Sequence, residues 1–232
     1  MNEYQVKTPS YAITNTFLRG VYLWMSIGLF LTAGVAYYVA TSPIILKALL
    51  TNPTLIFILI LGELGLVFAI SGAISKMSAS TATILFLLYS ALNGLTLSFI
   101  FLVYTSASIA KTFMVCGGMF AGISLYGYST SRDLSSWHSF LFMGLIGVII
   151  ASIVNMFFHS SQMEFVITII GIIVFVGLTA YDTQKLKQMG ETAPLDNAAL
   201  LQKGTILGAL ALYLDFINLF IFLLRIFGRP RN

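Results

Sequence analysis

Charged residues are what this sequence has least of. Only 9% of its 232 residues are Asp, Glu, Lys or Arg, whereas ordinary soluble domains carry about 25%. Hydrophobic residues make up 58%, and they occur in runs about as long as a bilayer is thick. This composition excludes a soluble enzyme and predicts a polytopic α-helical integral membrane protein surrounded by lipid.

Cysteine is nearly absent as well. Cys116 is the only one, so the chain cannot form an intramolecular disulfide, and we expect no cysteine-based metal site. The net charge of +4 could suggest nucleic acid, but the basic residues are scattered between hydrophobic runs. Membrane topology explains them better, and we expect no nucleic-acid partner.

Seven hydrophobic runs each provide the roughly 20 apolar residues that a transmembrane helix needs. They lie near residues 20–40, 54–74, 82–105, 109–129, 138–158, 164–183 and 203–225. The first run is longer than the core of about 7 to 15 residues in a signal peptide, so it should remain as a helix. We expect a polar segment at 1–19, one membrane domain at 20–228 and a basic tail at 229–232. The longest connection is predicted at about 184–202.

Cytoplasmic loops of membrane proteins hold an excess of Lys and Arg. With seven spans, the N-terminal side holds seven such residues and the other side five: Lys7, Arg19, Lys76, Arg132, Lys185, Lys187 and Lys203 against Lys47, Lys111, Arg225, Arg229 and Arg231. The count favours a cytoplasmic N-terminus. A re-entrant last segment would change it to ten against two, so the side of the C-terminus stays open.

Three carboxyl groups fall within the predicted spans: Glu63, Asp182 and Asp215. A charge inside a span costs about 2.5 to 3.5 kcal/mol on insertion scales, and such residues usually face the protein interior beside a partner. Two carboxyl groups close together cannot both ionise freely, so they could share a proton and titrate as a unit. Asp182 and Asp215 are the natural pair. Glu63 could join them or pair with Arg225.

The last run carries a stripe of small and polar residues at alternating spacings of four and three: Gly204, Gly208, Ala211, Asp215, Asn218, Phe222 and Arg225. These residues share one helix face, which should point into a helix bundle. Gly204 and Gly208 permit close approach of another helix. Gly118 and Gly122 form a second such pair, which we also interpret as tight packing.

Motifs of intramembrane enzymes are missing. Asp215 does not stand in the Gly-x-Gly-Asp motif of intramembrane aspartyl proteases, and Ser124 does not stand in the Gly-x-Ser-Gly motif of rhomboid proteases. The sequence also contains no His-Glu-x-x-His motif for zinc. His138 and His159 lie at helix ends, where an imidazole needs no special role. We therefore expect a protein that is not an enzyme and holds no cofactor.

Two stretches carry a resemblance to a known family. They are GLTAYDTQKLK, from Gly177 to Lys187, and ALYLDFINLFIFLLRIFG, from Ala211 to Gly228. In both, the chain resembles the Bax inhibitor-1 family (the transmembrane Bax inhibitor motif proteins), and within it the bacterial YccA-like branch. The resemblance implies an all-α, seven-helix membrane bundle with the last helix at its centre, in a bacterial inner membrane.

The resemblance also implies a function. Asp182 and Asp215 would form a proton-sharing pair that gates a pH-sensitive calcium leak, and Glu63 and Arg225 look like the acidic and basic residues that the family places near the path. Some members have a basic cluster after the second helix that can latch the aspartate pair, whereas this chain has only Lys76 there.

The expected depths of Asp182 and Asp215 in the membrane differ, which argues against direct contact between them in an upright bundle. At about 1.5 Å per residue, Asp215 lies about 18 Å beyond Lys203, whereas Asp182 lies only about 5 Å before Lys185. Contact between the two aspartates requires a last helix that starts outside the bilayer, tilts, or is re-entrant.

The leading hypothesis is thus a pH-regulated Ca²⁺ leak with Asp182 and Asp215 as sensor and gate and with Asn218 and Tyr213 as lining residues. Carboxylate and amide oxygens suit Ca²⁺ as transient ligands, and no stable metal site is expected. A second hypothesis is a regulatory protein that binds and restrains a membrane-anchored quality-control protease through residues 1–19. A proton-coupled transporter is less favoured, since the sequence has no clear inverted repeat.

Overall fold

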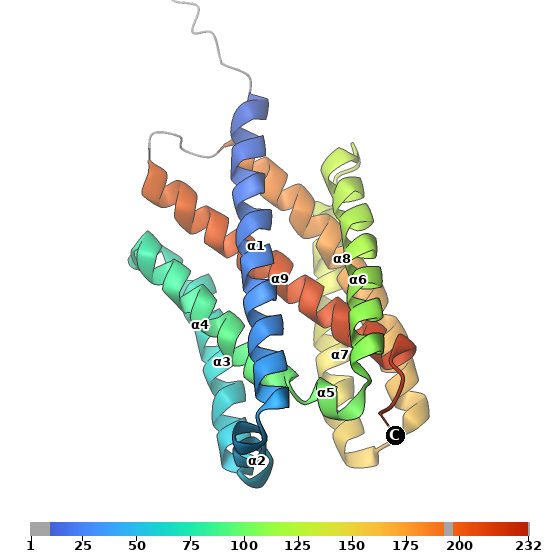
Figure 1. Ribbon diagram of the computed structural model, residues 1–232. Helices are drawn as coiled ribbons and strands as arrows, with labels where there is room; N and C mark the ends of the chain where they lie inside the picture. Colours follow the sequence, from blue (N-terminus) through green and yellow to red (C-terminus); the bar gives the residue numbers. More distant parts are fainter. Residues whose placement is uncertain (1–9, 193–196, 232) are drawn as a thin grey trace, which may run out of the picture.

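The hydrophobic runs form long helices joined by short turns (Figure 1). The computed structural model describes residues 10–192 and 197–231. The long helices are α1 (Ser10–Thr41), α3 (Pro53–Ala73), α4 (Ala79–Leu97), α6 (Ser106–Ser129), α7 (His138–Phe158), α8 (Ser161–Glu191) and α9 (Ala198–Phe227). Between them lie the short helices α2 (Pro43–Thr51) and α5 (Ile100–Val103) and the 3₁₀ turns η1 (Ile74–Lys76) and η2 (Ser135–Trp137).

Within these described ranges, seven helical stretches are long and apolar enough to cross a bilayer. They correspond one to one with the seven predicted runs, α4 and α5 together forming the third. The prediction of an all-α membrane protein with seven spans is therefore confirmed.

The bounds of two predicted polar segments, 1–19 and 184–202, are wrong. In both places the helices are longer than expected. The first helix begins at Ser10, because Phe17 and Leu18 are buried against the bundle although the residues around them are polar. The connection expected at 184–202 is also much shorter, since α8 continues to Glu191 and α9 starts at Ala198. Gln184 and Leu186 are buried, so packing on neighbouring helices extends α8 beyond its apolar run.

Helix ends follow ordinary capping chemistry. The hydroxyl of Ser78 accepts a hydrogen bond from the backbone N–H of Thr81 at 3.0 Å, and the hydroxyl of Ser160 accepts one from Met163 at 3.3 Å. These are the N-cap contacts that serine commonly makes. His159 ends α7 in the left-handed conformation, with a φ of 50°, which turns the chain directly into α8.

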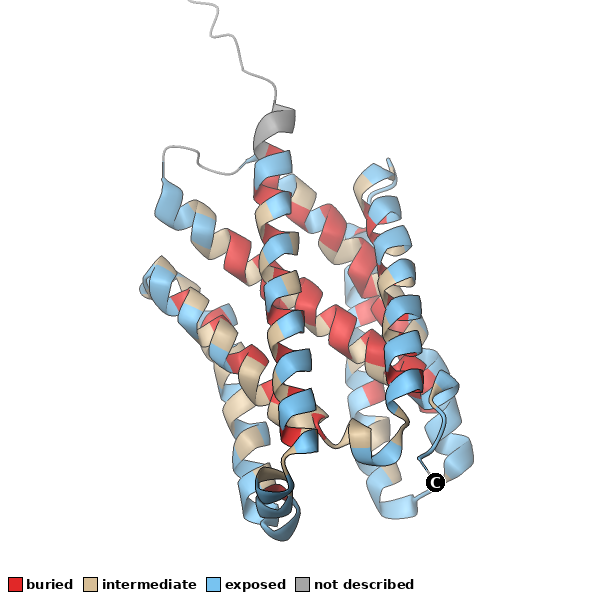
Figure 2. Cartoon of the chain, in the orientation of Figure 1, coloured by how far each residue is buried: buried red, intermediate tan, exposed pale blue. Residues whose placement is uncertain are grey.

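The last helix runs obliquely through the centre of the bundle (Figure 1) and contacts α1, α3, α4, α6 and α8. Of its most apolar stretch, 72% is buried, against 44% for α8 and 6% for α3; Figure 2 shows this as a nearly continuous buried band. This confirms the central position expected for the last helix. An unbroken α9 of 30 residues also excludes the re-entrant arrangement, and it ends on the opposite side of the bundle from the start of α1 (Figure 1).

Glycines mark the places where helices approach most closely. Gly208 of α9 packs against Leu186 of α8 and Val21 of α1, as the first half of the predicted stripe requires. The interpretation of Gly118 and Gly122 as a tight contact is wrong, because a Cβ atom at either position would meet nothing within 4 Å. Both glycines are exposed on the outer face of α6.

Candidate functional site

A cavity of about 1200 Å³ lies between α7, α8 and α9 and reaches Ser71 of α3. Its lining includes His138, the first residue of α7, and His159, which ends that helix. The cavity therefore follows α7 along its whole length. Lys185 lines it together with His138, and Glu164 and Arg225 line it towards His159.

Both predicted aspartates line this cavity. Asp182 is contributed by α8 and Asp215 by α9, and they lie near enough for their charges to interact. Asp215 is only 4% exposed, and its Oδ2 atom has no hydrogen-bond partner in the part of the chain that the structure describes. The expected difference in depth between Asp182 and Asp215 does not arise, because α9 is tilted. The tilt brings Asp215 to the same level of the bundle as Asp182.

Two cationic or ionisable groups face Asp182. Lys185 and His138 both interact electrostatically with its carboxyl group. The His138 ring also packs on Tyr181, with the ring centroids 4.9 Å apart. Lys76, the remaining basic residue after the second span, is exposed in η1 and does not line the cavity. The groups that face Asp182 thus come from α8 itself and from the start of α7.

The second half of the predicted α9 stripe faces the cavity. Ala211, Asp215, Asn218, Phe222 and Arg225 all contribute to its lining. The Asn218 side chain donates a hydrogen bond from Nδ2 to the carbonyl oxygen of Leu214 at 2.8 Å, a contact that does not use its amide oxygen. The Arg225 guanidinium lies over the Phe222 ring, 5.4 Å from its centroid.

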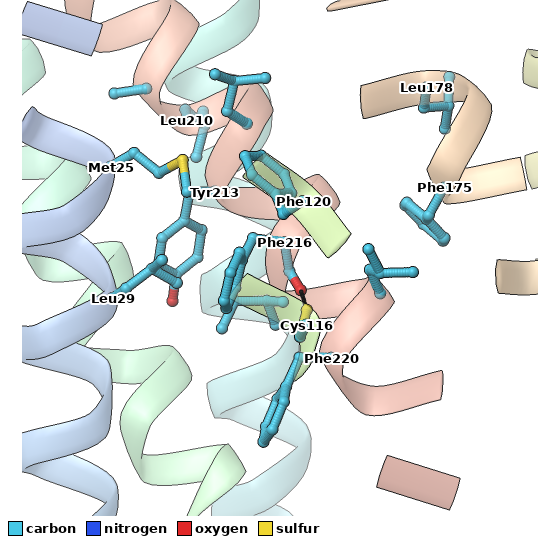
Figure 3. Packing of buried hydrophobic residues seen from close by; sticks show 14 of the residues in the cluster. Met25, Leu29, Cys116, Phe120, Phe175, Leu178, Leu210, Tyr213, Phe216 and Phe220 are labelled. Atoms are coloured by element: carbon cyan, nitrogen blue, oxygen red, sulfur yellow. Dashed lines mark hydrogen bonds between the residues drawn. The ribbon is translucent and has the colours of Figure 1, made fainter. Parts of the chain in front are cut away.

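Tyr213, expected to line the path, does not line the cavity. It is completely buried on the other side of α9, next to Met25 and Leu29 of α1, whereas Phe175 and Leu178 of the cavity wall lie across the helix (Figure 3). Its hydroxyl lies 2.6 Å from the hydroxyl of Thr32 and donates to the Oδ1 atom of Asn93 at 3.2 Å.

Glu63 belongs to this same buried network. Its carboxylate accepts hydrogen bonds from Thr96 at 2.9 Å and from Asn93 at 3.5 Å. The suggested pairing of Glu63 with Arg225 is wrong, because Arg225 stacks on Phe222 at the cavity instead. Glu63, Asn93, Tyr213 and Thr32 form a continuous polar network between α1, α3, α4 and α9.

Four of the cavity residues that sequence reasoning did not assign to the site carry a charge or an imidazole: His138, His159, Glu164 and Lys185. Lys185 carried a usable signal, since it follows Asp182 by three residues and shares its helix face. No comparable sequence signal marks His138 or His159, because a residue at a helix end can point either into the bundle or out to the interface.

These features define a class: a seven-helix integral membrane protein with an internal cavity lined by two carboxyl groups. The family described as "Inhibitor of apoptosis-promoting Bax1" matches residues 14–232. The chain belongs to this family, the Bax inhibitor-1 family, as its two motifs predict.

Its relatives cover nearly the whole chain. An inner membrane protein of Escherichia coli strain K12, YbhL, is 56% identical over 93% of this chain and 92% of its own length. An uncharacterised protein of Borreliella burgdorferi is 49% identical over 95% and 94% of the two chains. An uncharacterised membrane protein of Streptococcus pyogenes serotype M6 is 38% identical over 99% of each.

Proposed function

We propose that this chain is a pH-sensitive leak pathway for cations, Ca²⁺ in particular, gated by Asp182 and Asp215. It would act without catalysis in a bacterial inner membrane, the location that the name of the YbhL relative gives for that protein. The observation that carries the proposal is that two carboxyl groups from neighbouring helices line one cavity that follows α7 from end to end.

The donor chemistry supports a hard cation. Ca²⁺ prefers oxygen ligands from carboxylates, amides and water. Asp182, Asp215 and Asn218 offer such oxygens within one cavity. Since a carboxylate must lose its proton to bind the ion, protons and Ca²⁺ compete for the same groups, which makes the pathway sensitive to pH.

The apolar part of the lining supports a gate. Leu178 of α8 and Leu210 and Leu214 of α9 line the cavity within five residues of the aspartates along the same helices. Hydrophobic constrictions in channels close by losing water. A change in charge on the aspartate pair would change how well water fills this stretch, and so would open or close the pathway.

The proposal is tested by measuring Ca²⁺ flux into dye-loaded proteoliposomes between roughly pH 5 and 8, where a coupled carboxyl pair could titrate. The wild type is compared with Asp182→Asn and Asp215→Asn, which keep side-chain size but cannot exchange the proton. Glu191→Gln is the matched control, because Glu191 is exposed at the end of α8 and does not line the cavity.

We expect a pH-dependent flux in the wild type and the control, and an altered pH dependence in both aspartate variants. Absence of flux at every pH, with the purified protein folded and inserted, would rule out the leak pathway.

A further inference from the structure

A second cavity, a groove of about 610 Å³, lies between α1 and α6. It is separate from the aspartate cavity and shares no lining residue with it. The groove is at the end of the bundle where α1 begins and α6 ends, since the Tyr128 hydroxyl of α6 donates a hydrogen bond to the Oδ1 atom of Asn15 of α1 at 3.4 Å.

The outer end of the groove is polar and positively charged. Arg19 lines it and is exposed. Lys187 of α8 lies beside it, with its Nζ atom 5.0 Å from the centroid of the Tyr128 ring and donating to the Tyr128 carbonyl oxygen at 3.0 Å. The described lining contains no carboxylate, so this end of the groove attracts anions.

The inner end is apolar and open. Leu125 and Ala121 line it, and Gly118 and Gly122 continue the same face of α6 with nothing within 4 Å of a Cβ atom at either position. On α1 the lining descends from Asn15 to Tyr22, about 10 Å along a helix. The hydrocarbon layer of one leaflet is about 15 Å thick, so the groove has the length of a large part of an acyl chain.

A buried hydroxyl group points to a ligand within the groove. Ser124 lines it and is only 6% exposed. Its Oγ atom has no hydrogen-bond partner in the described ranges. An unpaired buried hydroxyl is costly, and an ester oxygen of a bound lipid would accept a hydrogen bond from it at the depth where the polar end of the groove gives way to the apolar end.

We propose that this groove binds one anionic phospholipid. The phosphate lies at Arg19 with Lys187 nearby, an ester oxygen accepts the Ser124 hydrogen bond, and an acyl chain follows the small-residue face of α6. Basic pockets between transmembrane helices bind anionic lipid headgroups in this way. The two cations and the absence of a carboxylate from the described lining select an anionic headgroup over a zwitterionic one.

The test is native mass spectrometry of the full chain in detergent, titrated with phosphatidylglycerol or with phosphatidylcholine. The wild type should retain one phosphatidylglycerol in clear preference to phosphatidylcholine. Arg19→Gln should weaken the retention of phosphatidylglycerol roughly fivefold, the effect of one basic residue near a membrane surface. Ala121→Phe should fill the groove and displace both lipids.

Each variant has a matched control. Lys76→Gln removes an exposed cation at the same end of the bundle, outside the groove. Ala110→Phe places the same bulk on an exposed position of α6, also outside the groove. Both controls should bind like the wild type. Equal retention of the two lipids, or equal losses in variants and controls, would overturn the proposal.

A thermal-stability titration with inorganic phosphate separates a lipid site from a simple anion site. Phosphatidylglycerol should raise the Tm of the wild type more than that of Arg19→Gln at the same lipid concentration, and inorganic phosphate should raise neither. Protection by inorganic phosphate equal to that by the lipid would show that an anion alone occupies the groove, which would also overturn the proposal.

Discussion

Gly127 of α6 lies directly against the carbonyl oxygen of Ala180 of α8. A Cβ atom at position 127 would overlap the backbone of α8, which cannot move aside as a flexible side chain could. Ala180 precedes Asp182 by only two residues. The contact therefore fixes the position of the helix segment that carries one of the two cavity aspartates.

We predict that Gly127→Ala destabilises the protein. Overpacking typically costs about 1 to 3 kcal/mol, which corresponds to a drop in Tm of roughly 2 to 12 °C for a chain of this size. Gly122→Ala is the control on the same helix, because a Cβ atom there meets nothing within 4 Å. Its Tm should equal or exceed that of the wild type, since alanine favours helix over glycine. Equal Tm values for the two variants in a thermal-shift measurement would show that the α6–α8 contact is not tight.

The proposed sharing of a proton between Asp182 and Asp215 predicts that their substitutions are not additive. Once one carboxyl group is replaced by an amide, the shared site no longer exists, and replacing the second should change the pH dependence of flux little further. The double-mutant cycle should show a coupling of at least about 0.5 kcal/mol, roughly twofold in rate. Effects that simply multiply would mean that the two groups act independently.

The path should follow the α7–α8–α9 cavity and avoid the α3–α4 network. Asn218→Leu removes a polar group from the cavity lining and should lower flux roughly 5- to 30-fold, the equivalent of about 1 to 2 kcal/mol for one polar group inside a membrane. Glu63→Gln keeps the size of a residue outside the cavity and should leave flux within about twofold of the wild type. A larger loss with Glu63→Gln than with Asn218→Leu in the liposome assay would place the path along Glu63.

Regulation of a membrane-anchored protease stays a prediction, and the structure changes how it should be tested. Residues 1–9 lie outside the described ranges, whereas Phe17 and Leu18 are buried in α1. Deleting 1–19 would therefore damage the helix, so the deletion should stop at residue 9. If the segment binds the protease, this variant should lose its restraint on degradation of a membrane substrate while Ca²⁺ flux is unchanged. Restraint that persists without the segment would contradict this mode of regulation.

Hydrophobic length and helical period made much of the fold predictable from the sequence. Run length alone predicts the seven spans, and the spacing of Asp215, Asn218 and Arg225 predicts their place on one cavity wall. Periodicity shows which residues share a face, but it does not show which neighbour that face meets. Tyr213 was misplaced for this reason, because α9 has neighbours on several sides and carries polar groups in two directions.

The same limit explains the glycines and the histidines. Gly118 and Gly122 match a packing motif, yet Gly127 makes the close contact, since the crossing point of α6 and α8 depends on the tilt of both helices. His138 and His159 line the cavity at the two ends of α7, where the helix follows η2 and where it ends in a left-handed residue. Short-range sequence patterns do not encode either feature.

The position of α9 has a consequence for how the protein is made. Synthesis proceeds from the N-terminus, so α9, which contacts five other helices, leaves the ribosome after the six other long helices that the structure describes. Until it enters the bilayer, α1, α4, α6 and α8 lack the surface on which they pack in the finished bundle. The cavity wall that carries Asp215 is also missing at that stage. A chain interrupted before residue 198 therefore holds six inserted spans without the central helix on which they pack, and the proposed pathway cannot form until α9 has joined them.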